Sequence, residues 1–191
     1  MEALLRPYDS VHDEPAALRL WDACLGDRWP ISPDAFRYLM TGGSHLVASV
    51  DGGVAGLIGV QQQGERGSIL AVLVAPAHRR RGIGRSLLAA AQHHLQGQGA
   101  ATVQLGGGAR DFFWCGVPAD TPGAWAFFQG CGWVQDETSY DLVGELPTCT
   151  TPPRVWDRVR SAGVTVRRAA LRPGGGPAFW AHALPGLGAK L

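Results

Sequence analysis

An apolar strand that runs into a glycine- and arginine-rich turn and then into an amphipathic helix constrains this chain more than any other feature. Residues 69–77 form its longest uninterrupted apolar run. After His78 come a tight turn and a helix start, which together hold Arg79, Arg80, Arg81, Gly82, Ile83, Gly84, Arg85 and Ser86. A run without polar alternation indicates a strand buried on both faces, so other elements must cover it twice. The apolar spacing over residues 85–96 predicts a helix with one apolar face.

The turn has the chemistry of an anion site. Gly82 and Gly84 let the backbone approach a ligand closely, and the N–H groups at the start of the helix have no partner within the helix. The flanking arginines add charge-assisted hydrogen bonds, so the turn predicts a pyrophosphate site. A solvated basic turn that happens to hold two glycines is the alternative. The sequence lacks the Gly-Lys-Ser/Thr of a P-loop and the third glycine of a dinucleotide fingerprint, which excludes both.

The remaining pattern predicts an α/β fold, an α+β arrangement with a mixed sheet. Pro15, Ser32-Pro33 and Thr121-Pro122 mark helix starts, and residues 51–53 mark a hairpin turn. Strands are expected at residues 3–8, 45–50, 54–61, 68–74, 101–105, 133–135 and 139–143, and helices at 15–25, 33–40, 85–96 and 122–130.

Composition limits the classes of partner. The chain of 191 residues carries a net charge of +1, which argues against a general affinity for nucleic acid or an anionic membrane. The apolar run of nine residues is far shorter than the roughly 20 that a membrane span needs. The four cysteines lie far apart, without the spacing of a zinc site. We therefore expect a cytoplasmic protein without a metal.

A step in charge divides the chain. Residues 1–145 carry a net charge of −5 and residues 146–191 one of +6, with the linker-like residues 150–153 near the step. We expect a main domain over 1–145 and a tail over 146–191 with a short helix at 154–161 and a strand at 164–168. The tail has too little apolar periodicity for a core of its own. It must dock on the main domain, pair with another chain or remain loose.

The arginine–glycine turn resembles a family motif. Arg79-x-x-Gly82-x-Gly84, after a strand ending at residues 74–76, resembles the acetyl-CoA motif of GNAT N-acetyltransferases. Residues 124–133 are similar to a second segment of that family, and the likeness covers about residues 3–145. The resemblance implies the GNAT fold, in which a bulged fourth strand is splayed from the fifth. It also implies acetyl-CoA as cosubstrate and transfer of the acetyl group by direct attack of a primary amine, on an unidentified and small substrate.

The resemblance also implies where acetyl-CoA binds. The pantetheine arm would lie between the fourth and fifth strands and the pyrophosphate in the turn. The implied contacts are Leu73, Val74, Arg79, Arg80, Arg81, Gly82, Ile83, Gly84, Arg85 and Ser86.

The chain departs from the family pattern in the catalytic groups. Phe128 stands where the family often has a tyrosine that protonates the departing thiolate, and Thr121 where it often has asparagine; an N-cap role fits Thr121 better. Glu65 and Asp111 are candidate bases for the amine proton, and solvated loop carboxylates are the alternative. The absence of a clear acid and base keeps a second function open, a CoA-binding sensor or subunit with little turnover.

The tail resembles the start of a second GNAT domain. Residues 164–169 are similar to the first strand at residues 4–7, and the Gly116-Val117-Pro118 loop is similar to one found in tandem GNAT proteins. This likeness predicts a tandem protein with a truncated second half, and an unfinished half invites pairing as a homodimer.

Overall fold

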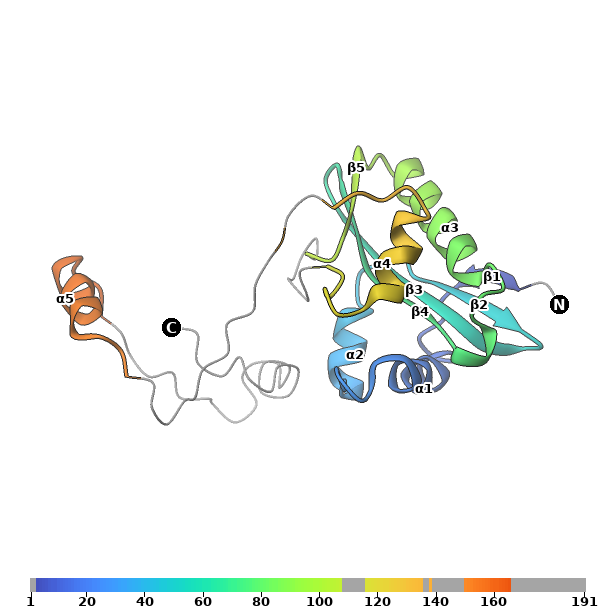
Figure 1. Ribbon diagram of the computed structural model, residues 1–191, viewed down its shortest axis with the longest axis horizontal. Coiled ribbons are helices and arrows are strands. Elements are labelled where there is room, and N and C mark those ends of the chain that lie inside the picture. The colour runs from blue at the N-terminus through green and yellow to red at the C-terminus, as the bar shows by residue number, and fades with distance from the viewer. Residues whose placement is uncertain (1–2, 108–115, 136–137, 139–149, 166–191) are drawn as a thin grey trace. The chain divides into compact units, whose positions relative to one another are not determined.

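The computed structural model of the chain is drawn in Figure 1, and the structure describes residues 3–107, 116–135, 138 and 150–165. Two compact units are present, residues 1–137 and 138–191. The first holds the sheet and its helices, and the second holds α5 (Pro153–Ser161). In these described ranges, no helix combines the length and the apolar character that crossing a membrane requires.

The first unit is built on a five-stranded mixed sheet in which the strands lie side by side in chain order. All neighbouring pairs are antiparallel except β4 and β5, which are parallel. This mixed sheet confirms the predicted fold class. The strands are β1 (Leu4–Pro7), β2 (Leu46–Val50), β3 (Gly53–Gln63), β4 (Arg66–Val74) and β5 (Thr102–Leu105).

Helices cover both faces of the sheet (Figure 1). One core lies against α1 (Glu14–Leu25) and α2 (Pro33–Leu39) and is centred on Trp21 and Phe36, both fully buried. The other lies against α3 (Ile83–Gly97), and side chains of α4 (Pro122–Gln129) pack on its border. The central strands are therefore covered twice, as the unalternating apolar run requires.

Helix α3 packs close to the sheet because glycines stand beneath it. A Cβ atom at Gly56 of β3 would lie 2.9 Å from Leu87, and one at Gly67 of β4 would lie 2.9 Å from Leu95. Both leucines are almost fully buried. The two glycines thus let the leucine face of α3 reach the sheet backbone, which fixes the helix along β3 and β4.

The predicted bulge and splay are both present in β4. Gly59 faces Ala71 while Val60 faces Ile69, so Leu70 is an extra residue on β4, a β-bulge. Pairing with β5 covers residues 66–69 of β4, and its last pair is Ile69 with Leu105. β4 continues to Val74, roughly 16 Å beyond that pair at the usual rise per residue. In the part of the chain that the structure describes, the sheet therefore opens between the two strands.

Two predicted strands differ from the structure. Residues 133–135 are not a strand, because the Trp133 N–H donates to the Phe128 carbonyl (3.0 Å) and closes the end of α4 instead of joining the sheet. Residues 139–143 lie outside the described residues. In the tail the helix at 154–161 is confirmed as α5. The strand predicted at 164–168 is wrong at 164 and 165, where the Val164 N–H bonds back to Val159 (3.1 Å), and its remainder is not described.

A partly buried ion pair ties the first strand to the first helix. Both Asp13 oxygens accept hydrogen bonds from the Arg6 guanidinium, at 2.6 and 2.7 Å, and Oδ2 also accepts the Asp9 N–H at 2.8 Å. Asp13 is only 4% exposed. The hydrogen bond from Arg6 lowers the pKa of Asp13 below its ordinary value. A carboxylate with a lowered pKa stabilises the fold wherever it is ionised.

We expect Asp13→Asn to lower the free energy of unfolding at pH 7 by about 1.5–3 kcal/mol, because hydrogen bonds to a charged group are lost. The loss shrinks as the pH falls below about 4, where the unfolded carboxyl becomes protonated, and disappears below the lowered pKa of the folded state. Urea unfolding at several pH values measures it. Asp34→Asn, which removes an exposed ion pair with Arg37, is the matched control and should change little. Equal effects of the two substitutions would contradict the role of Asp13.

Candidate functional site

The N-terminus of α3 lies directly after the turn that follows β4. Gly82 is the N-cap, with a φ of 85°, and no side chain caps the helix there. The first hydrogen bond within the helix is the one from the Ser86 N–H to the Gly82 carbonyl (3.0 Å). The N–H groups of the preceding residues in the first turn consequently point out of the helix end, where the helix dipole favours an anion.

The second glycine of the motif, Gly84, is required for a different reason than Gly82. Gly84 lies in the first turn of α3, where a Cβ atom would come within 3.3 Å of the Phe127 ring and 3.6 Å of Val74. Phe127 belongs to α4, so Gly84 is the point where α4 approaches α3. Space, rather than backbone conformation, restricts this position, whereas Gly82 has open space and a restricted φ.

The four arginines of the turn divide into two pairs. Arg79 donates from Nε to the Val74 carbonyl (3.0 Å), and Arg85 donates to the Gly130 carbonyl after α4 (3.3 Å). Arg80 and Arg81 are exposed, and within the described ranges neither forms an ion pair. Arg80 also has a positive φ of 64°. The first pair fastens the turn to its surroundings, and the second pair leaves two cations available at the helix end.

The Val74 carbonyl is a junction that the sequence did not predict. Besides Arg79 it accepts a hydrogen bond from the Cys24 thiol of α1 (3.4 Å), and the Cys24 sulfur lies 3.6 Å from the Arg79 guanidinium. These contacts join α1, the end of β4 and the turn. Fifty residues separate Cys24 from Val74, so no local pattern in the sequence could have indicated the contact.

At the end of β4, successive residues direct their N–H and C=O groups in turn towards β3 and towards the opening of the sheet. The Ala75 N–H donates to the Ala55 carbonyl of β3 (2.9 Å), so the alternation of an antiparallel ladder turns the peptide groups of Val72 and Val74 to the other side. That side is the one on which β5 has ended. Leu73 is paired with Leu57 of β3.

The position expected to supply an acid holds an apolar ring cluster. The Phe128 ring lies 5.0 Å from that of Phe127 and 6.1 Å from that of Trp133, centroid to centroid, and all three rings are partly buried against the α3 core. Thr121 is the N-cap residue of α4 by position, but its hydroxyl donates to the Pro118 carbonyl (2.6 Å) instead of capping the helix. Phe128 therefore cannot protonate the departing thiolate, because a phenyl ring has no acidic proton.

The predicted site residues are not all brought together. Leu73 and Val74 end β4, and Arg79 to Ser86 lead from it into α3, so these predicted cofactor contacts are contiguous. Glu65 lies exposed in the turn before β4, at the other end of that strand, where its carbonyl accepts the Ala101 N–H (2.7 Å). Nine residues of strand, roughly 30 Å, separate it from the turn. Asp111 lies outside the described residues, and the role of either carboxylate as a base stays a prediction.

We expect Gly82→Ala to lower the free energy of unfolding by about 1–2 kcal/mol, because a Cβ atom disfavours the left-handed conformation. Gly97→Ala, at the other end of α3, is the matched control: it lacks a positive φ and has open space, so it should stabilise by about 0.5–1 kcal/mol. Thermal or urea unfolding of the two variants measures the difference. Destabilisation by both to the same extent would contradict the conformational role of Gly82.

Solved structures share this architecture. A glucosamine N-acetyltransferase region of a fungal multi-domain β-N-acetylglucosaminidase aligns over 83% of this chain with a TM-score of 0.74 and 27% identity. The chain spans only 20% of that protein. PaiA N-acetyltransferase from Thermoplasma acidophilum, solved in complex with coenzyme A, aligns over 73% of this chain and 94% of its own, with a TM-score of 0.57 and 14% identity.

A third structure, a ribosomal-protein-alanine N-acetyltransferase from Brucella melitensis, aligns over 73% of this chain and 98% of its own, with a TM-score of 0.57 and 15% identity. Among curated protein sequences, none matches this chain significantly. The model of the acetyltransferase (GNAT) family matches residues 14–133, more than half of the chain, and this range includes α3 and strands β2 to β5 of the sheet. With the bulged β4 and the open end of α3, this match places the chain in the GNAT acetyltransferase family, whose members use acetyl-CoA.

Proposed function

We propose that the chain transfers the acetyl group of acetyl-CoA to a primary amine of a small molecule by direct attack of the amine. The observation that carries the proposal is the N-terminus of α3, which begins after the N-cap residue Gly82 and has no side-chain cap. It follows the C-terminal part of β4, which β5 does not pair. The uncapped N–H groups would bind the pyrophosphate, and the adjacent part of β4 that β5 does not pair would take the pantetheine arm, a combination that suits acetyl-CoA.

The pyrophosphate would accept hydrogen bonds from the first-turn N–H groups of α3, Ile83 and Gly84 among them. Arg80 and Arg81 would add charge, because their guanidinium groups are exposed at the same helix end. Arg79 and Arg85, which hold carbonyl groups of the surrounding chain, would keep the turn in place. We propose this division of work among the four arginines.

The pantetheine arm would lie along β4 beyond its last pair with β5. Its amide groups can bond to the peptide groups of Val72 and Val74, which face that side, with Leu73 contributing to the wall of β3 and β4. Arg79 and Cys24 occupy the Val74 carbonyl. The N–H groups on this side of β4 are therefore the better candidates for the first contact with the arm.

Bound acetyl-CoA would supply a thioester to the splayed part of the sheet. The amine must arrive neutral; its nitrogen bonds to the carbonyl carbon, the carbon–sulfur bond breaks, and the amine proton passes to solvent. Because thiols are far more acidic than alcohols or amines (the cysteine thiol has a pKa of about 8.5), a thiolate can leave near neutral pH without a proton donor. The phenyl ring of Phe128 is compatible with this route, and holding the reactants in place supplies the main part of the rate enhancement.

An amino sugar is the first acceptor class to test. The fungal region that aligns over most of this chain is a glucosamine N-acetyltransferase by name, and its identity to this chain is 27%. That protein is about five times longer than the aligned part, so its own substrate is only a guide. Glucosamine is therefore placed first among small amines.

We expect acetyl-CoA to bind the wild-type chain with micromolar affinity in a calorimetric titration, and Gly84→Glu to weaken binding at least tenfold, or by about 1.4 kcal/mol. The new carboxylate would stand at the anion site and repel the pyrophosphate. Gly97→Glu adds the same charge at the far end of α3 and should bind like the wild type. Because a side chain at Gly84 crowds Phe127, the exposed double substitution R80A/R81A gives a second test without loss of packing. Wild-type affinity in both variants would exclude this anion site.

Turnover separates the enzyme from a CoA-binding sensor. We expect free CoA thiol to appear from acetyl-CoA when glucosamine or another small amine is added, with a rate that rises with pH as the amine loses its proton. A thiol-reactive dye measures the release, and mass spectrometry identifies the acetylated product. Tight binding of acetyl-CoA without product over a broad panel of amines would favour the sensor.

A further inference from the structure

An ion pair connects two distant parts of the chain beside the opening between β4 and β5. The Arg28 guanidinium donates from Nη2 to Oδ2 of Asp120 at 2.5 Å, and the two residues are 92 positions apart in the sequence. Arg28 lies in the segment after α1, and Asp120 lies two residues before α4. Of the ion pairs that the described residues form, this one alone joins the α1 and α2 side of the fold to the α4 side.

Arg28 stands on the β4 side of the opening. Four residues before it, the Cys24 thiol donates to the Val74 carbonyl (3.4 Å), which holds the end of α1 against the end of β4. The Trp29 carbonyl accepts the indole N–H of the buried Trp21 (2.8 Å), so the segment after α1 is fastened to the core. The Arg28 guanidinium lies 4.3 Å from the centre of the Trp29 ring, and this cation–π contact orders its side chain.

Asp120 stands on the β5 side of the opening. A Cβ atom at Gly116 would lie 3.7 Å from the carbonyl oxygen of the last residue of β5, so the loop that carries Asp120 begins beside the end of that strand. Within the loop, the Pro118 carbonyl accepts hydrogen bonds from the Thr121 N–H (3.1 Å), the Thr121 hydroxyl (2.6 Å) and the Trp125 indole N–H (3.0 Å). This carbonyl therefore ties the loop to the first turn of α4.

The ion pair thus joins the two sides of the opening by an exposed contact. The side chains of Arg28 and Asp120 are 46% and 63% exposed, so water and salt reach both charges. Exposed ion pairs contribute little free energy, and such a pair separates and re-forms readily. The hydrogen bond from Arg28 lowers the pKa of Asp120, so the carboxylate stays ionised and able to re-form the pair at neutral pH.

We propose that Arg28 and Asp120 form a gate, which closes the opening between β4 and β5 in the unliganded chain and parts to admit an extended ligand. Rotation of two exposed side chains is sufficient to part it, while the supports at Val74 and Pro118 stay in place. That the admitted ligand is acetyl-CoA rests on the proposed function. The gate itself is defined by the chain and can be tested without that ligand.

The labelling rate of Cys24 measures the gate, because its thiol lies on the Val74 carbonyl at the opening. The full chain is treated with N-ethylmaleimide, which is uncharged, and peptide mass spectrometry follows each cysteine. We expect Arg28→Asp and Asp120→Arg, each of which sets two like charges against each other, to raise the Cys24 rate about 3- to 10-fold. The double substitution R28D/D120R restores an ion pair of reversed polarity and should return the rate to within about twofold of the wild type.

The signs of the two single substitutions separate a gate from a direct effect on the thiol. A new negative charge near Cys24 disfavours the reactive thiolate, and a new positive charge favours it. A direct electrostatic effect would therefore lower the Cys24 rate in Arg28→Asp and raise it in Asp120→Arg. Parting of the gate raises the rate in both.

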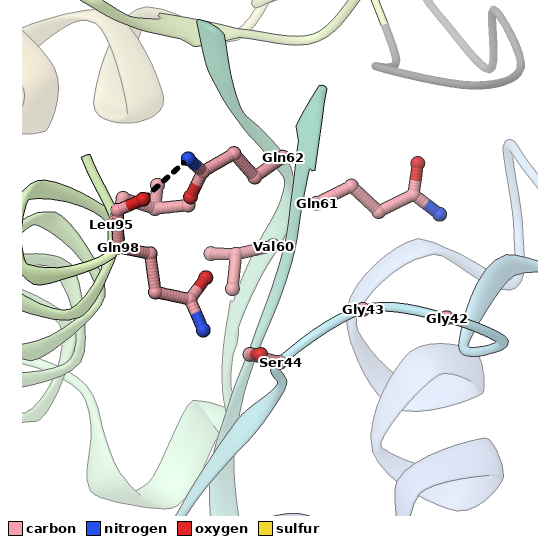
Figure 2. A pocket seen from close by; sticks show the side chains of 8 residues that line it. All are labelled: Gly42, Gly43, Ser44, Val60, Gln61, Gln62, Leu95 and Gln98. Atoms are coloured by element: carbon pink, nitrogen blue, oxygen red, sulfur yellow. Dashed lines mark hydrogen bonds between the residues drawn. The ribbon is translucent and has the colours of Figure 1, made fainter. Parts of the chain in front are cut away.

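Two controls locate the effect. Cys131, the other free cysteine among the described residues, lies beyond the end of α4 and should be labelled at one rate in all variants. Gln98→Arg adds a positive charge beside the pocket shown in Figure 2, at the C-terminal end of α3. Fifteen helical residues, about 22 Å, separate that end from the turn that follows β4, so this substitution should leave the Cys24 rate unchanged.

The gate is overturned if the single substitutions leave the Cys24 rate at the wild-type value, or if the double variant reacts as fast as the single ones. Acetyl-CoA at about 1 mM, well above a micromolar Kd, should slow the labelling of Cys24 in the wild type. The expected pattern among the variants without this protection would support the gate and contradict the proposed function. The two failures are therefore distinguishable.

Discussion

The early end of the pairing between β4 and β5 is the constraint on which the functional half of this molecule depends. Within the described residues, the two strands have no registered pair after Ile69 and Leu105, while β4 continues with its bulge at Leu70. A strand that keeps only one neighbour presents the other side of its backbone to whatever enters the gap. The other edge of β4 is paired with β3 in a long antiparallel ladder. Helix α3 packs on the face of these strands at Gly56 and Gly67, where the absence of a side chain lets it come close. Among the described elements, β3 and α3 thus hold this part of β4 in place.

The turn after β4 connects this opening to the end of α3, and its arginines have unequal surroundings. Arg79 and Arg85 contact carbonyl groups that belong to β4 and to the end of α4. Such contacts make the turn part of the rigid framework, so its N–H groups are oriented before any ligand arrives. The exposed Arg80 and Arg81 remain free to adjust. A rigid set of neutral donors together with two adjustable cations suits a ligand with two adjacent phosphate groups.

Local patterns in the sequence were sufficient for the elements that depend on local physics. The apolar run, the hairpin turn, the Ser32 cap and the leucine spacing of α3 all predicted structure that is confirmed, because each depends on neighbours within a few residues. The strand at 133–135 was wrong because Trp133 bonds back to Phe128, and propensity does not reveal which of two partners a peptide group takes. The contact of Cys24 with Val74 and the distance of Glu65 from the turn both depend on tertiary structure. The boundary at 145, the truncated second domain and pairing through the tail stay predictions.

The two glycines of the arginine-rich motif are required for different reasons, backbone conformation at Gly82 and space at Gly84. At position 82 the backbone needs the mirror image of the ordinary conformation, so a residue of opposite chirality, D-alanine, would fit there and would even hold the chain in place. At position 84 the helix needs the ordinary hand and the space needs only a hydrogen atom, so neither enantiomer of alanine is a good replacement. The same residue type therefore meets two unrelated requirements in one motif: backbone handedness at position 82 and small side-chain volume at position 84.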